Sequence, residues 1–249
     1  MSNAVVWVDS RNRAPGGTDS DFEVSLRETI HMSNARLRVD KITFTDSFFT
    51  TDSGSKLYFA DGTGGINTFS ISEGAYTGPT LAAAIQLRTG RATTYEPLSN
   101  SIVHTLAAVD QPWLSDEELV AHPLSSILGI TSIANTNSLN SILGEGINIG
   151  ILVTFPFVRM SPYNYLFLRS SRLRCVDHHG PRGTHDILCS VMLAQGPGEQ
   201  VVASSPDGMY YDPQGELSIR SFDIRLTDYL DRPVNLRGRP LALQLTFDG

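Results

Sequence analysis

Residues 5–26, "VVWVDSRNRAPGGTDSDFEVSL", place two strand-like runs on either side of a polar segment. The first run is β-branched and aromatic, and "FEVSL" alternates apolar with polar residues, which is typical of a strand with one buried face. The polar segment leads into a strand rather than a helix, which argues against a phosphate-binding loop. It predicts a tight connection, either a solvated turn or one pinned by Asp9 with Arg11 or Arg13 through charge-assisted hydrogen bonds.

Strand signals continue along most of the chain. The run "ARLRVDKITFT" (residues 35–45) alternates with a phase slip near Lys41, as a β-bulge produces. Turn clusters such as "DGTGG" separate further short strand candidates. Many short strands with few helices predict an all-β protein, a single jelly-roll β-sandwich with one or two short helices. We expect one domain over residues 1–249, with loop insertions at about 109–146 and 176–216.

Two segments have helical spacing instead. "GPTLAAAIQLRTG" (residues 78–90) predicts a helix capped by Thr77 or Thr80 and ended by Gly90, and "SDEELVAHPL" predicts a short helix after Ser115. Before the first helix, we expect Gly74 to supply a positive φ. Tyr76 and Leu81 are expected to hold this strand-to-helix unit against the sandwich.

Composition narrows the function classes. The chain has 249 residues, a net charge of -7, two lysines and seventeen arginines. No basic arm is present, which argues against direct nucleic-acid binding. The arginine bias either suits subunit interfaces or reflects genomic base composition. No signal peptide or transmembrane segment is recognised, because the longest apolar run, "INIGILVTFPFV", is too short and contains Pro156. We therefore expect an intracellular product with reduced thiols.

The densest titratable cluster is "CVDHHGPRGTHDILC" (residues 175–189). Its weak metal-ligand candidates are His178, His179 and His185, but their spacing matches no usual metal motif, and a polar loop between strands is favoured. Cys175 and Cys189 either lie close together in a hairpin or are two small buried residues. Because no phosphate-binding loop or nucleophile elbow is found either, we predict no catalytic residue, no metal and no cofactor.

Several segments in order resemble the penton, or minor capsid, proteins of double-jelly-roll DNA viruses, which include virophages and Polinton/Maverick elements. The similar segments are "VDSRNR" (8–13), "SDFEVSL" (20–26), "ARLRVDKITFTDSFF" (35–49), "FSISEGAYTGPTLAAAIQ" (69–86), "SSILGI" (125–130) and "IRSFDIRLTDYLDRPVNLRGRPLALQLTF" (219–247). The resemblance covers the two ends of the chain well and the middle poorly.

This resemblance implies a jelly-roll virion protein without catalysis, located at the capsid vertex and made inside the host cell. It implies a homo-pentamer whose neighbours are a double-jelly-roll major capsid protein and, as further candidates, other minor capsid or spike proteins. Asp9, Arg11, Arg13, Gly74, Tyr76 and Leu81 are then structural or interface residues. Two alternatives stay open: a receptor- or glycan-binding spike domain, and a metal-dependent jelly-roll enzyme using the three histidines.

Overall fold

The computed structural model describes residues 3–33, 36–51, 54–108, 112–128, 130–133, 136, 138–173, 184–194, 198–205 and 216–249. The chain divides into two compact units. Unit 1 comprises Met1–Phe48 and Tyr163–Gly249, and unit 2 comprises the intervening Phe49–Pro162. The expectation of one domain over residues 1–249 did not anticipate this division.

In its described residues, unit 1 holds two four-stranded antiparallel sheets. Its strands are β1 (Asn3–Asp9), β2 (Asp21–Ser33), β3 (Arg36–Thr45), β10 (Tyr165–Arg169), β11 (Ile187–Met192), β12 (Gln200–Ala203), β13 (Glu216–Thr227) and β14 (Ala242–Asp248). One sheet has the order β1-β14-β3-β12 and the other β11-β10-β13-β2. Lettered B to I in chain order, these are the sheets B-I-D-G and F-E-H-C of a jelly roll. The predicted all-β jelly-roll class is confirmed.

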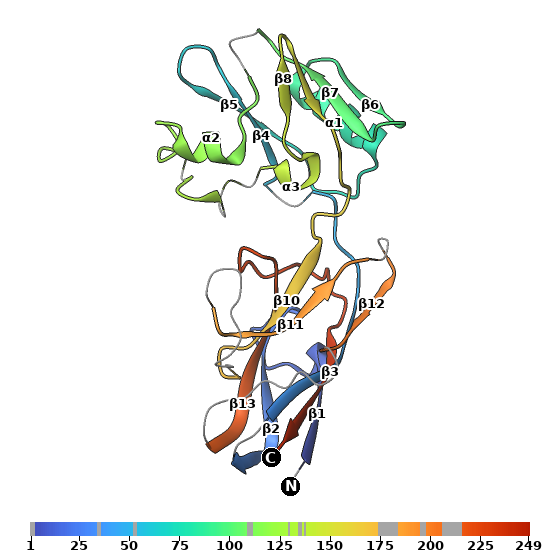
Figure 1. The fold of residues 1–249 in the computed structure, drawn as a ribbon, viewed down its shortest axis with the longest axis vertical. Coiled ribbons are helices and arrows are strands. Elements are labelled where there is room, and N and C mark those ends of the chain that lie inside the picture. Colours follow the sequence, from blue (N-terminus) through green and yellow to red (C-terminus); the bar gives the residue numbers. More distant parts are fainter. Residues whose placement is uncertain are drawn as a thin grey trace. The chain divides into compact units, whose positions relative to one another are not determined.

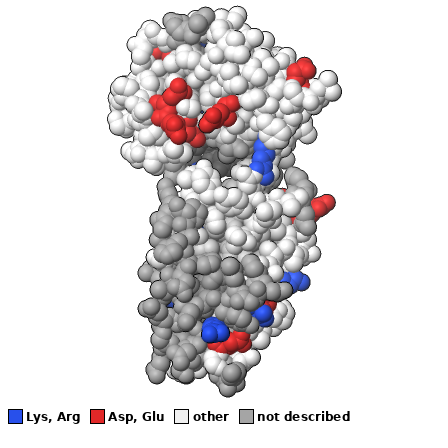
Figure 2. All heavy atoms as spheres, in the orientation of Figure 1, with Lys and Arg blue, Asp and Glu red and all other residues white. Residues whose placement is uncertain are grey.

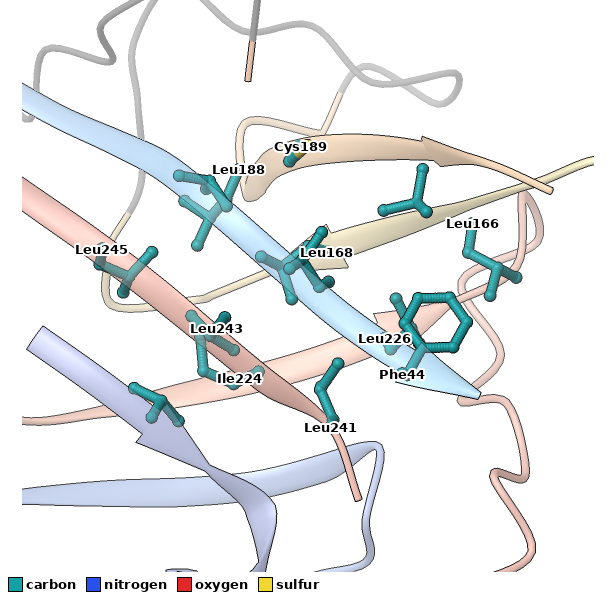
Figure 3. Close-up of a cluster of buried hydrophobic side chains, with 14 of the residues drawn as sticks. Phe44, Leu166, Leu168, Leu188, Cys189, Ile224, Leu226, Leu241, Leu243 and Leu245 are labelled. Carbon is teal, nitrogen blue, oxygen red and sulfur yellow. The ribbon is translucent and has the colours of Figure 1, made fainter. Parts of the chain in front are cut away.

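The core of unit 1 lies between its two sheets, where leucines from both sheets meet Phe44 and Cys189 (Figure 3). Strand β3 shows how the sequence pattern builds this core. Gln244 pairs with Lys41 whereas Leu245 pairs with Val39, so Asp40 is an extra, bulged residue. The predicted phase slip is therefore confirmed as a bulge, and it keeps the apolar residues of β3 facing inward on both sides of Lys41.

The two ends of the chain lie side by side. Strand β1 pairs with β14 over its whole length, from Asn3 opposite Asp248 to Asp9 opposite Ala242, and Figure 1 shows both termini at the same end of unit 1. Strand β14 also pairs with β3 on its other side, so it occupies an inner position in the sheet. Its alternating residues Leu243, Leu245 and Phe247 are buried in the core.

Among the residues that the structure describes, unit 2 has a hairpin, a four-stranded sheet with the order β6-β7-β9-β8, and three helices (Figure 1). The hairpin is β4 (Lys56–Ala60) with β5 (Ile66–Ser70), closed by the predicted "DGTGG" turn. The sheet consists of β6 (Thr93–Glu96), β7 (Ser101–Thr105), β8 (Ile147–Ile149) and β9 (Leu152–Phe155). The helices are α1 (Gly78–Thr89), α2 (Asp116–Ala121) and α3 (Asn140–Leu143).

Helix α1 forms where the sequence predicted it. The Thr80 hydroxyl accepts a hydrogen bond from the Thr77 N–H at 2.8 Å, and Gly90 ends the helix with a φ of 69°. Leu81 on its inner face is fully buried. All members of its hydrophobic cluster belong to unit 2. The prediction that Leu81 holds the helix against the sandwich is therefore wrong, because α1 packs on the sheet and hairpin of its own unit.

We expect Leu81→Ala to destabilise unit 2 by about 2–5 kcal/mol, because it leaves a cavity in a fully buried cluster. The matched control on the same helix is Leu87→Ala, whose side chain is 81% exposed and whose loss should change stability by less than about 0.5 kcal/mol. Denaturant unfolding of both variants measures the difference. Equal stabilities for the two variants would contradict the packing described here.

Candidate functional site

The polar segment after β1 is a structural connection. The Asp9 carboxylate accepts hydrogen bonds from the Arg11 backbone N–H at 2.9 Å and from the Arg11 guanidinium. The hydrogen bond from the Arg11 side chain lowers the pKa of Asp9. The Asp9 side chain also caps a short 3-10 helix over Ser10–Asn12. Arg13 contacts a different carboxylate, donating to Asp19 at 2.7 Å and to the carbonyl of Gly17 at 2.9 Å. Of the two predicted arginines, Arg11 is the one that meets Asp9.

The serine of this segment links the two ends of the chain. Ser10 is fully buried. Its N–H donates to the carbonyl of Leu241 at 2.9 Å, and its hydroxyl accepts from the Leu241 N–H at 3.0 Å. These two bonds fix the residue that precedes β14 against the residue that follows β1. Sequence reasoning singled out the charged residues on either side and missed Ser10.

The segment before β14 is anchored in a similar way. Asp228 is 2% exposed, and its carboxylate accepts from the N–H groups of Leu230 and Arg232 and from the Arg232 guanidinium at 2.7 Å. The turn continues to Val234 and Leu236, which are buried in the core of unit 1. The "D-x-x-D-x-x-V-x-L" pattern at residues 228–236 is thus one capped turn with two apolar anchors.

Gly74 has a different role from the one predicted. It is absent from the residues with positive φ, so that prediction is wrong. Its backbone pairs with Thr51 through two hydrogen bonds of 3.1 Å. A Cβ atom at Gly74 would lie 3.3 Å from the Tyr76 ring, so close approach of that ring favours glycine here. Tyr76 packs against the core of unit 2 and donates its hydroxyl hydrogen to the Ser72 carbonyl at 3.0 Å.

The histidine cluster lies mostly outside the described residues, which exclude Cys175, His178 and His179. His185 is described and exposed. Cys189 is a free thiol in the core of unit 1, where burial raises its pKa to about 11. Within the described part of the chain, no group of three His, Cys, Asp or Glu side chains is placed to hold a metal.

The carboxylate beside His185 belongs to a buried ion pair. Arg169 is 1% exposed, and its guanidinium donates to Asp186 at 2.7 Å and to Thr227 at 2.9 Å. Arg225 donates to the second oxygen of Asp186 at 2.8 Å. Charge-assisted bonds of this kind compensate the desolvation of a buried arginine. The sequence signal was an arginine inside the apolar run "NYLFLRS", which on a strand is expected to be exposed or paired.

Unit 2 contains a buried histidine. His104 on β7 is 1% exposed, its Nδ1 lies 2.8 Å from the Thr93 hydroxyl, and its Nε2 has no hydrogen-bond partner. Burial, together with nearby Arg91, lowers the pKa of His104 to about 4. A hydroxyl beside an imidazole is a feature of nucleophilic sites. This imidazole is sealed from solvent, however, and is a core residue.

The edge strands of unit 1 differ in their protection. On β2 the exposed residues include Glu23, Arg27 and Glu28, and such charges discourage strand pairing with another molecule. Strand β1 instead exposes Val5 by 50% and Trp7 by 73%. It has β14 as its neighbour on one side and no partner strand on the other among the residues that the structure describes.

Comparisons with known proteins add a structural likeness. No family model matches the chain, and no curated protein matches it. A search of solved structures finds the crystal structure of the selenomethionine-labelled mavirus penton protein, with a TM-score of 0.43 and 10% sequence identity. That match covers 98% of this chain and 99% of the other. No helix in the described ranges has the length and hydropathy needed to span a membrane.

We expect Arg169→Ala to destabilise unit 1 by about 3–5 kcal/mol, because it breaks a buried, hydrogen-bonded ion pair. Arg172→Ala is the matched control: this arginine is 55% exposed, pairs with Glu23 at 3.0 Å, and should cost about 0–1 kcal/mol. Denaturant unfolding checks both variants. If both arginines prove equally dispensable, the Arg169 network contributes nothing to stability.

We also expect a pH-dependent stability of unit 2. His104 stays neutral in the folded state down to about pH 4, whereas the unfolded chain takes up a proton near pH 6.5. Neutral His104 therefore contributes fully to the free energy of unfolding above pH 6.5. As the pH falls from 6.5 toward 4, the free energy of unfolding decreases by at most about 1.4 kcal/mol per pH unit.

His104→Gln removes this titration and should flatten the slope of unfolding free energy against pH in that window. His31→Gln is the control for replacing a histidine, because His31 lies in unit 1, outside unit 2. The measurement is denaturant unfolding at a series of pH values. A His104→Gln slope equal to that of the unchanged protein would contradict the assignment.

Proposed function

We propose that this chain is a structural virion protein, a penton or minor capsid protein that forms a five-membered capsomer at the vertex of an icosahedral DNA virus. The observation that carries the proposal is the strand order B-I-D-G and F-E-H-C, together with the positions of the similar segments. A jelly roll alone is compatible with many functions, so the segments supply the specific part of the argument.

The resembling segments have structural roles in this chain. "VDSRNR" supplies Ser10, which binds the start of β14, and the "D-x-x-D-x-x-V-x-L" pattern supplies the Asp228 turn. "GAYTGPTL" supplies the Thr51 pairing, Tyr76 and the cap of α1. Capsid jelly rolls that need the same hydrogen bonds, turn and helix cap would keep similar segments. This structural use of the segments supports a non-catalytic role.

The surface of unit 1 supports assembly with neighbouring subunits. The open edge of β1, with Val5 and Trp7 exposed, is a surface that another subunit would cover. A ring needs heterologous contacts, in which one side of each subunit matches the opposite side of the next. A double-jelly-roll major capsid protein is the proposed neighbour outside the ring, and Asp9, Arg11 and Arg13 are structural residues near the β1 edge.

Light scattering after size exclusion, over a series of concentrations, tests the ring. Five chains of 27.2 kDa give a mass of about 136 kDa, and averaged electron micrographs should show five-fold symmetry. A stable trimer that binds glycans on an array would overturn the proposal in favour of a spike domain. Stoichiometric zinc or iron in untagged protein, lost with His178→Ala and His185→Ala, would favour the enzyme.

A further inference from the structure

The sheet β1-β14-β3-β12 of unit 1 ends in two open edges. Among the residues that the structure describes, β1 and β12 each have a neighbouring strand on one side only. Trp7 on β1 is 73% exposed, and Val202 on β12 is 54% exposed. An edge strand presents unpaired N–H and C=O groups that a further strand can bind. Both edges therefore offer a surface for extension of the sheet.

On β1, the residues with exposed side chains are also those whose backbone groups point outward. The Ser10 N–H donates to the Leu241 carbonyl, so Ser10 directs its N–H toward the strand that pairs with β1. Hydrogen-bond direction alternates along an antiparallel strand. Val5 and Trp7 therefore direct their N–H and C=O groups away from β14, on the open side of the sheet.

Strand β12 has the same arrangement. The Asp46 N–H donates to the Glu199 carbonyl at 2.8 Å, so Glu199 directs its carbonyl toward β3. By the same alternation, Gln200 and Val202 direct their backbone groups away from β3. Their side chains are exposed as well, whereas that of Val201 between them is buried in the core.

The distribution of charge favours this sheet over the other for contact between copies. A chain with a net charge of -7 repels its own copies, so contact is favoured where charge is sparse. Figure 2 shows acidic side chains gathered on unit 2 and few charged side chains on the visible part of unit 1. Residues 3–8 of β1 and 200–203 of β12 carry no charge. In the other sheet of unit 1, the edge strand β2 exposes Glu23, Arg27 and Glu28, which discourage extension there.

The two edges fit each other as neighbouring strands. The four strands alternate in direction, so β12 of one copy runs antiparallel to β1 of the next when the two sheets are aligned. Within one copy the pairing ladders place Val202 level with Asp9. Sliding the next copy by two residues puts Val202 opposite Trp7 and Gln200 opposite Asp9, so that all four residues of β12 are paired. On the outer face an aliphatic side chain then meets an aromatic ring, and an amide meets a carboxylate.

We propose that β12 of one copy pairs with β1 of a second copy of this chain, which extends the β1-β14-β3-β12 sheet from one subunit into the next. The two strands differ, so the contact is heterologous and repeats from copy to copy. The pairing names the strands through which the proposed capsomer assembles, and closure of the repeat at five copies rests on that proposed function.

A second copy is the occupant because it supplies the missing strand to both edges. Every copy has one β1 edge and one β12 edge, and a head-to-tail contact covers both, whereas pairing of β1 with itself would leave β12 open. Because β12 has four residues, a single pairing is small beside the roughly 800 Å² per partner of a standard stable interface. In a closed ring each copy makes the contact twice, and every contact supports the others.

Crosslinking of two different variants tests the inference. In a Cys175→Ser background, Val5→Cys and Val202→Cys chains with different tags are mixed and treated with a short bis-maleimide. These positions are diagonal neighbours in the proposed pairing, roughly 7–8 Å apart. Within one copy three strand spacings separate them, at least about 14 Å. We expect a mixed dimer at a yield about tenfold or more above that of either variant alone. Ser25→Cys, exposed on β2 in the other sheet, replaces Val5→Cys as the control and should give no mixed dimer.

A backbone change adds a second readout. Proline lacks an N–H, and the N–H of Val202 points away from β3, so Val202→Pro removes a hydrogen bond of the contact and spares the pairing of β12 with β3. Val202→Thr is the matched control, because it keeps the N–H and the β-branched shape. Light scattering over a series of concentrations should show self-association weakened about tenfold by Val202→Pro and less than about twofold by Val202→Thr. Circular dichroism and denaturant unfolding verify that both variants are folded.

The outcomes separate this contact from the proposed ring. A chain carrying both Val5→Cys and Val202→Cys should give a ladder of crosslinked species that ends at five. A ladder ending elsewhere supports the contact and overturns the five-membered ring. A five-chain mass without mixed crosslinks supports the ring and overturns the contact. Crosslinking of Val5→Cys with itself at the yield of the mixed pair would overturn the contact in favour of pairing between two β1 strands. Equal association of Val202→Pro and Val202→Thr would overturn it in favour of a contact made by side chains alone.

Discussion

Strand β14 lies between β1 and β3 and is hydrogen-bonded to both, so the B-I-D-G sheet exists only while this strand is in place. Without it, β1 would lose its pairing partner, and β3 would be left paired with the four residues of β12 alone. The inner side chains Leu243, Leu245 and Phe247 would leave the core at the same time. The polar contacts of the segment just before β14 are therefore important, because they hold the strand in place.

Those contacts set where β14 begins. The Ser10 hydroxyl and N–H hold Leu241, and the Asp228 carboxylate closes the turn that returns the chain from β13. Because both polar groups are buried, each must find partners, and those partners include backbone N–H groups of the segment before β14. Burial thereby fixes both the position and the register of the strand. A capsid role would place the same requirement on the chain, since a subunit interface needs sheet edges at fixed positions.

Local patterns in the sequence predicted local structure well. The phase slip at Lys41 gave the bulge, and the spacing of Leu81 and Ile85, with Thr77 and Gly90 at the ends, gave α1. The same patterns do not state what a buried face packs against, so the separate core of unit 2 was not predicted. Gly74 was misjudged because glycine serves both positive φ and close packing, and only the Tyr76 ring distinguishes them. The partners of Arg169 were also inaccessible, because Asp186 and Thr227 are brought to it by the strand order.

Unit 2 enters and leaves the jelly roll between β3 and β10, at Phe48 and Tyr163. These two rings, both in unit 1, form an edge-to-face pair with centroids 4.9 Å apart. The two chain crossings are therefore held together by the jelly roll itself. Any folded segment whose two ends lie equally close would satisfy this connection without altering a strand of the sandwich. The aromatic pair thus makes the position modular, and lineages could exchange one inserted unit for another while retaining the same jelly roll.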